Sequence, residues 1–227
     1  MVLPRYLAMT RAEFTQCSSF PQHIAWMACH FSPYGTGLVN LPPDLPEGAM
    51  VILNDRIPMA GHDPNTVLDQ LQNLNMSCLL LDFQHAPTAE SLSLVGMLTE
   101  SLTCPVAVPP AYGQELPCPL FLPPPPPDTP LEEYLAPWKG RELWLEIGLD
   151  AIRYTVTEKG STAASLFLIP EAGEVDAELS CHYRTRFSSD RAEFDIWRTL
   201  SDLDALLEKA KSHGVTKAVG LWQELGK

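Results

Sequence analysis

Polar side chains that could do chemistry follow several short apolar runs of this chain. They are His30; Asn54, Asp55 and Arg56; Asp82, Gln84 and His85; Tyr112; Glu146 and Asp150; and Gln223 and Glu224. If the runs are parallel strands, their carboxyl ends meet at one edge and bring these groups together. Several carboxylates gathered beside apolar residues are typical of sites that bind a sugar or another small molecule, and two of them could act as acid and base. The sequence therefore predicts a small-molecule or glycan site at this edge.

The candidate residues divide into two groups. Asp82, Glu146 and Asp55 are the catalytic candidates, with Glu146 as an acid and Asp82 or Asp55 as its partner, which requires carboxyl groups about 5 to 9 Å apart. The ligand-binding candidates are Gln84, Trp222, Glu224, Tyr112 and His30.

No metal ion and no cofactor are expected. The chain has no Cys-x-x-Cys pair, and its repeated Cys-His dipeptide, at 29–30 and 181–182, lacks the spacing of a ligand pair.

The elements that must position these residues follow from the apolar runs and the helix signals between them. The runs cover residues 24–29, 50–53, 78–81, 105–108, 120–122, 143–147, 165–169 and 218–222. Helices are expected after Asp63, Thr88 and Ser201, each with an apolar stripe. This alternation predicts an α/β fold, a compact and irregular (β/α)8 TIM-type barrel. The competitor is an open doubly wound sheet, which here lacks the Gly-x-Gly-x-x-Gly turn.

Residues 1–227 are expected to form a single barrel domain, with 1–20 as a peripheral N-terminal segment. Twelve prolines between residues 105 and 137 leave little room for a full helix there. Residues 151–158 alternate as in a half-exposed antiparallel strand, and the acidic stretch 171–178 is expected to be a surface loop.

Charge and composition exclude some partners. The chain has 15 Lys and Arg against 28 Asp and Glu, a net charge of −13, which disfavours nucleic acid and anionic membranes. No apolar run approaches the roughly 18 residues of a membrane span. Six widely spaced cysteines indicate reduced thiols and a cytoplasmic protein. The expected partner is a small-molecule or glycan ligand, and the sequence does not define the oligomeric state.

One segment resembles a known family. Ser77-Cys78-Leu79-Leu80-Leu81-Asp82-Phe83-Gln84 is similar to the active-site strand of chitinase-like barrels, glycoside hydrolase family 18, which reads Asp-x-x-Asp-x-Asp-x-Glu. The last Asp of that motif falls on Asp82 and the acidic Glu falls on Gln84. Residues 106–109 resemble the family's next strand, and 214–226 resemble its final helix and strand, with Trp222 at the floor of the sugar site. Together these matches cover about 80 residues of the expected barrel.

The departures from the motif bear on activity. The resemblance implies that the Glu protonates the leaving oxygen, and Gln84 has no titratable proton to give. Leu80 and Ser77 replace the other two Asp residues. Counted from residue 24, moreover, this is strand three, whereas the family has the motif on strand four; a strand over 5–9 would restore the count.

These observations predict a glycoside hydrolase-like barrel, a pseudoenzyme that lacks chitinase activity and binds a carbohydrate or related small ligand. One alternative is an active hydrolase that uses Glu146 with Asp82 or Asp55, and another is a non-catalytic scaffold subunit. If the alignment holds, Asp82 and Gln84 face the barrel axis and Phe83 faces the surrounding helices.

Overall fold

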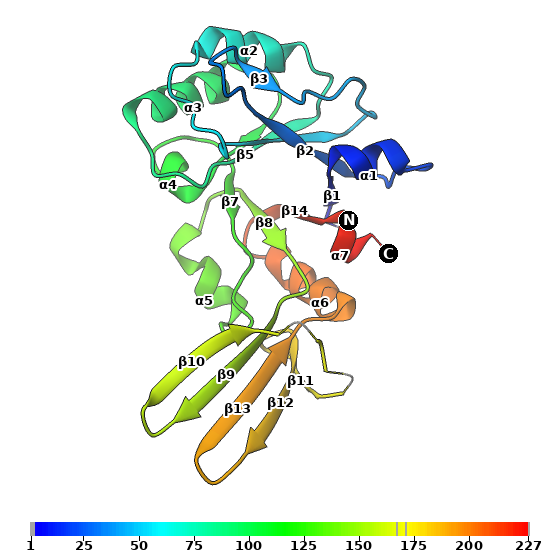
Figure 1. The fold of residues 1–227 in the computed structure, drawn as a ribbon, viewed down its shortest axis with the longest axis vertical. Helices are drawn as coiled ribbons and strands as arrows, with labels where there is room; N and C mark the ends of the chain where they lie inside the picture. Colours follow the sequence, from blue (N-terminus) through cyan, green and yellow to red (C-terminus); the bar gives the residue numbers. More distant parts are fainter. Residues whose placement is uncertain (1–2, 167, 171, 227) are drawn as a thin grey trace.

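The computed structural model describes residues 3–166, 168–170 and 172–226, and its main body is a parallel β-barrel (Figure 1). Its eight strands lie in the order β6-β5-β4-β2-β1-β14-β8-β7. A parallel bridge between Val108 and Leu120 joins β6 to β7, with Phe121 N donating to Val108 O at 2.8 Å, and so closes the ring. The strands are β1 (Arg5–Met9), β2 (Ile24–Phe31), β4 (Met50–Asn54), β5 (Cys78–Asp82), β6 (Val106–Ala107), β7 (Leu120–Leu122), β8 (Leu143–Ile147) and β14 (Val215–Leu221). The predicted barrel class is confirmed.

The first strand decides the strand count. β1 pairs in parallel with β14, Arg5 opposite Ala218, and with β2, Leu7 opposite Ile24. Residues 5–9 therefore lie in the barrel wall and not in a peripheral segment. Counted from β1, the strand that ends at Asp82 is the fourth.

The helices are few, and most connections are short or rich in proline. The longer ones are α2 (Pro64–Gln72), α3 (Ala89–Ser101) and α6 (Leu200–Lys211); the shorter ones are α1 (Arg11–Gln16), α4 (Pro110–Gly113), α5 (Leu131–Leu135), the 3-10 turn Ala136–Trp138 and α7 (Trp222–Leu225). Asp63 and Thr88 cap α2 and α3 as predicted, because each side chain accepts a hydrogen bond from a backbone N–H of the first turn. The predicted cap at Ser201 is wrong, since Thr199 caps α6 and Ser201 lies inside the helix. In the described residues, no helix combines the length and the apolar character that a membrane crossing requires.

One cluster of buried apolar side chains fills the interior of the barrel, and we call it the apolar plug. It is formed by Tyr6, Ala8, Ala25, Met50, Ile52, Cys78, Leu80, Ala107, Phe121, Trp144 and Val219. Alternate residues of a strand share a face, so Asp82 follows Leu80 and Glu146 follows Trp144 on the inward side. A larger apolar cluster, which includes Phe83 and Leu94 of α3, lies between the strands and the outer elements. The apolar plug thus ends in carboxylates at the carboxyl end of the barrel.

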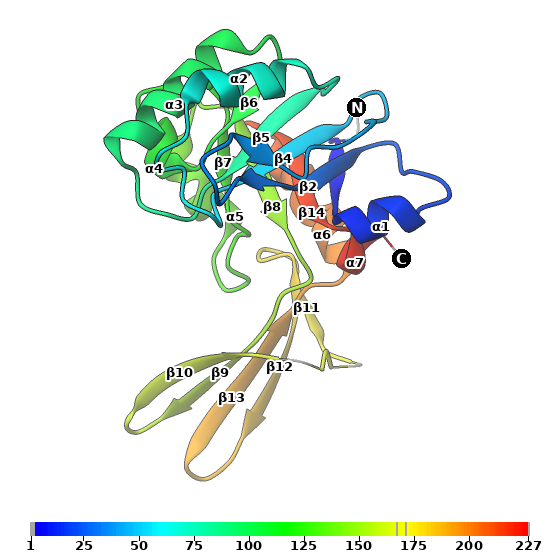
Figure 2. The ribbon, with the colours of Figure 1, turned by 45° about the horizontal axis from the view of Figure 1, so that its top comes forward.

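A second sheet is inserted between β8 and α6 and projects away from the barrel (Figures 1 and 2). It has five antiparallel strands in the order β10-β9-β13-β12-β11. Its strands are β9 (Ala151–Thr157), β10 (Gly160–Ser165), β11 (Glu174–Asp176), β12 (Cys181–Phe187) and β13 (Arg191–Trp197). We refer to it as the inserted sheet.

The inserted sheet tests three sequence predictions. The antiparallel strand expected over 151–158 is confirmed as β9. The described part of the run 165–169 is not a barrel strand, because the exposed strand β10 ends at Ser165; Phe167 lies outside the described residues. The acidic stretch 171–178 is not only a loop, since Glu174–Asp176 form β11; Glu171 lies outside the described residues.

Candidate functional site

A cavity of about 800 Å³ lies over the carboxyl ends of the barrel strands, and we call it the mouth cavity. Polar side chains reach it from several strands and the loops that follow them: Thr10, His30, Asn40, Asn54, Arg56, Asp82, Gln84, His85 and Glu146. Its floor includes Leu80 and Phe121 of the apolar plug. Four of the predicted site residues, His30, Asp82, Gln84 and Glu146, therefore share one cavity.

The end of β5 places Asp82 and Gln84 on the same side. Gln84 Nε2 donates to Asp82 Oδ1 at 2.5 Å, and both side chains line the mouth cavity. Phe83 turns the other way and packs against Phe31 and Tyr112, with ring centroids 5.9 and 5.4 Å away. The predicted alternation of these three residues is confirmed.

Burial makes Asp82 a weaker acid than a free aspartic acid. Its pKa is raised mainly by the loss of water, and also by the nearby charge of Asp55. The hydrogen bond from Gln84 opposes this shift because it stabilises the carboxylate.

Asp55 lies behind this strand end and is not among the residues that line the mouth cavity. It is 4% exposed, and its carboxylate accepts hydrogen bonds from the backbone N–H groups of Gln84 and His85 at 2.8 and 3.0 Å. His85 Nδ1 lies 3.0 Å from the same carboxylate. Because these contacts occupy both oxygens, Asp55 fixes the turn that presents Gln84. The structure gives this catalytic candidate a positioning role.

Glu146 reaches the mouth cavity from β8. Burial raises its pKa to about 7, with further contributions from the charges of Asp82, Asp150 and Glu224. A carboxyl group with this pKa carries a proton in a large fraction of molecules at neutral pH, as a general acid must. Glu224 itself does not line the cavity; its Oε2 accepts a hydrogen bond from Leu149 N at 3.2 Å.

His30 is held in one orientation at the cavity wall. Its Nδ1 lies 2.8 Å from Phe31 O, and Asn40 Nδ2 lies 3.1 Å from its Nε2. An amide NH₂ can only donate, so in this arrangement Nε2 accepts and Nδ1 carries the proton. Asn40 and Thr10 were not predicted as site residues. Asn40 has a positive φ of 55° directly after the short strand β3 (Leu38–Val39), a backbone feature that the sequence alone did not indicate.

Tyr112 and Trp222 are not brought into the mouth cavity. Tyr112 is buried, and its hydroxyl donates to His85 O at 3.0 Å, so it supports the loop after β5. Trp222 begins α7 and packs against a small cluster around Met9 and Ile24. Both residues act on the site only through the elements that they support.

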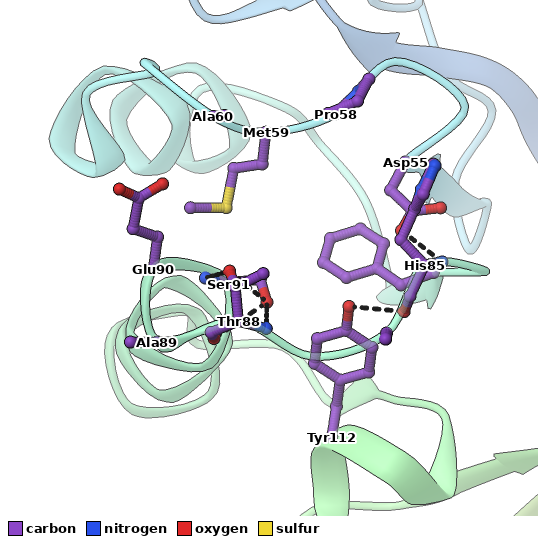
Figure 3. Close-up of a pocket in the computed structure, with 12 residues that line it drawn as sticks. Asp55, Pro58, Met59, Ala60, His85, Thr88, Ala89, Glu90, Ser91 and Tyr112 are labelled. Atoms are coloured by element: carbon purple, nitrogen blue, oxygen red, sulfur yellow. Dashed lines mark hydrogen bonds and ion pairs between the residues drawn. The ribbon is translucent and has the colours of Figure 1, made fainter.

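A second cavity of about 590 Å³ lies beside the mouth, between the loop after β4 and the start of α3 (Figure 3). Its walls are mostly apolar and include Met59, Phe83 and Tyr112. Asp55 and His85 form one side of it, and His85 also lines the mouth cavity. Within the described residues, no group of three or more His, Cys, Asp or Glu side chains has the arrangement of a metal site.

Comparison with solved structures identifies the fold. The chain is similar to the spore cortex-lytic enzyme SleL of Bacillus cereus, with a TM-score of 0.61 and 11% identity over 96% of this chain and 70% of that one. It is also similar to the putative sporulation-specific glycosylase ydhD of Bacillus subtilis, with a TM-score of 0.51 and 10% identity over 86% of this chain and 90% of that one. No protein-family model matches the sequence, and no curated protein matches it. At such low identity the likeness shows a shared barrel fold.

Proposed function

We propose that this protein is a glycan-binding barrel of the chitinase-like type in which an amide replaces the catalytic acid. The observation that carries the proposal is the end of the fourth strand, where Asp82 and Gln84 face the mouth cavity and bond to each other. The two similar structures, a spore cortex-lytic enzyme and a putative sporulation-specific glycosylase, add a link between this fold and glycans.

The chemistry of the mouth supports binding more than hydrolysis at this position. Gln84 offers an amide donor and acceptor but no proton to a leaving oxygen. Leu80 belongs to the apolar plug, so the middle Asp of the motif has no counterpart there. Asn54, His30 and Arg56 add side chains that can bond sugar hydroxyl or acetamido groups.

Isothermal titration calorimetry with oligomers of N-acetylglucosamine tests the proposal. We expect binding that weakens at least about tenfold in Asp82→Asn and stays within roughly twofold in Asp190→Asn, which makes the same charge change in the β12–β13 turn. We expect Trp222→Ala to weaken binding less than Asp82→Asn, because Trp222 lies outside the cavity. No heat with any glycan, or equal effects of the two Asp variants, would refute the proposal.

A second candidate function is hydrolysis with Glu146 as the acid and Asp82 as its partner. The raised pKa of Glu146, about 7, is the observation that favours it. An aryl glycoside of N-acetylglucosamine has a good leaving group and is the appropriate substrate. We expect a rate that falls as the pH rises through the pKa of Glu146 and that is lost in Glu146→Gln. No rate above that of Glu146→Gln at any pH would refute this candidate and leave the binding function.

The biological setting follows from the ligand. A cytoplasmic location, as the sequence predicts, fits a short glycan or a peptidoglycan fragment better than an extracellular polymer. All six cysteines lie in the described part of the chain and form no disulfide bond there. Their reduced state in the cell stays a prediction. Fractionation of cells, followed by detection of the protein with an antibody, tests the location.

A further inference from the structure

The inserted sheet carries a row of arginines around one buried carboxylate. Arg153 of β9 and Arg184 of β12 lie directly opposite Asp195 of the central strand β13. The Asp195 side chain is 0% exposed. Arg153 binds it through two nitrogens, Nε to Oδ1 at 2.6 Å and Nη2 to Oδ2 at 3.0 Å, and Arg184 Nη2 donates to Oδ2 at 3.0 Å. The three residues share one face of the sheet.

Two more arginines on this face of the sheet, Arg186 and Arg191, add further positive charge. Arg186 Nη2 lies 3.0 Å from Asp195 Oδ2 and 3.1 Å from Glu193 Oε2. Arg191 Nε lies 3.2 Å from Glu193 Oε1. Four guanidinium groups thus face two carboxylates, which leaves two positive charges on a chain whose net charge is −13.

These arginines have hydrogen-bonding capacity left. A guanidinium group has five N–H donors, and Arg184 uses one nitrogen in its bond to Asp195. Its Nε is buried and has no partner among the described residues. The Arg184 side chain is 40% exposed, so its remaining Nη donors, and not the buried Nε, are the ones that a ligand can reach.

A cavity of about 840 Å³ lies on this face, and we call it the arginine cavity. Arg153 and Arg184 line it on the side of the sheet, and Leu166, Leu168, Ile169 and Pro170 line it on the other side. Leu168 and Ile169 are exposed, although large apolar side chains are usually covered. The cavity therefore offers two guanidinium groups, which share the Asp195 carboxylate, beside an apolar wall.

We propose that the arginine cavity binds an organic carboxylate that carries an apolar chain or ring. The planar fork of a guanidinium matches a carboxylate, as Arg153 already shows with Asp195, and the apolar wall would cover the hydrocarbon part. Octanoate represents this class of ligand. This inference is independent of the glycan site, because no residue of the arginine cavity lines the mouth cavity.

Calorimetry with octanoate, octanamide and acetate tests separately the contribution of the carboxylate and the contribution of the apolar chain. We expect octanoate to bind one site at least about tenfold more tightly than the neutral octanamide and than acetate, which lacks the chain. Because the arginines are partly exposed, affinity for octanoate should also fall as salt is added. Equal affinity for octanoate and octanamide, or no heat with octanoate at about 10 mM, would overturn the proposal.

Matched variants locate the site. Arg184→Gln should weaken octanoate binding at least about tenfold, whereas Arg191→Gln, the same change outside the cavity, should leave it within roughly twofold. Ile169→Ala is a second test that does not depend on the stability of Arg184→Gln, because Ile169 is exposed. It removes part of the apolar wall and should weaken octanoate binding several-fold. Equal effects of the two arginine variants, or an unchanged affinity in Ile169→Ala, would contradict the proposal.

Discussion

The pair formed by Gln84 and Asp82 makes a specific prediction about pH and stability. Gln84→Glu replaces the amide donor, which lies 2.5 Å from Asp82 Oδ1, with a second carboxyl group. Two carboxylates about 3 Å apart repel by roughly 1.4 kcal/mol in bulk water and roughly 5.5 kcal/mol at an effective dielectric constant of 20. Gln84 is exposed, so the lower figure applies. It corresponds to a rise of about one pKa unit for the new carboxyl group.

The sign of the effect follows from proton binding. A carboxyl group whose pKa is raised in the folded state binds more protons there than in the unfolded chain, so folding stability falls as the pH rises between the two pKa values. Gln84→Glu should therefore lose about 1.4 kcal/mol between about pH 4 and pH 6, relative to the wild type, and nothing more above that. Urea unfolding at a series of pH values measures this loss.

Gln84→Ala is the matched control for this experiment. It removes the same hydrogen bond but adds no charge, so its stability relative to the wild type should fall with rising pH only by the amount that this bond contributes to lowering the pKa of Asp82. The further loss in Gln84→Glu then reports the added carboxyl group. Both proteins contain the other acidic groups of the chain, and subtraction removes their common titration. If Gln84→Glu and Gln84→Ala show the same pH dependence, the two side chains at the end of β5 do not face each other, and the alignment behind the proposed function fails.

Three further substitutions have expected outcomes. Glu146→Gln should gain stability relative to the wild type by roughly 1 to 3 kcal/mol as the pH rises from about 4.5 to 7. The reason is that the pKa of Glu146 is raised, because its burial as an anion is unfavourable. Urea unfolding at pH values across this window measures the gain. Asp55→Asn should destabilise the protein by about 1 to 3 kcal/mol, since an amide NH₂ would face the N–H groups of the turn, and the urea midpoint measures it. Phe83→Ala should cost about 3 to 5 kcal/mol through the lost contacts with Phe31 and Tyr112, and an unchanged thermal midpoint would contradict the packing described here.

The barrel was predictable where burial dictates the sequence. Strands β4, β5 and β8 are buried on both faces and read as continuous apolar runs, which is why their ends could be located. Residue parity placed Asp82 and Gln84 on one face of the strand, and the resemblance to the chitinase-like motif indicated that this face is the inward one.

The missed elements have weaker sequence signals. β1 has the sequence Arg-Tyr-Leu-Ala-Met, with only four apolar residues after the arginine, and it was expected only as the strand that would restore the count, although Tyr6 and Ala8 fill the barrel. β10 is exposed along its whole length, and β12 alternates with arginine. Such strands are stabilised by cross-strand partners far apart in the sequence, such as Arg153 and Asp195, and pairing of this kind cannot be identified from local periodicity.

The distribution of charge links the two proposed sites. Burial raises the pKa of Glu146, and the negative charges of Asp82, Asp150 and Glu224 raise it further. A negative field of this kind repels anions and suits a neutral glycan, whose hydroxyl and acetamido groups carry no charge. The arginines of the inserted sheet have the opposite sign and attract anions. The two proposals together therefore predict that a ligand with a carboxylate binds at the inserted sheet and a neutral sugar binds at the barrel.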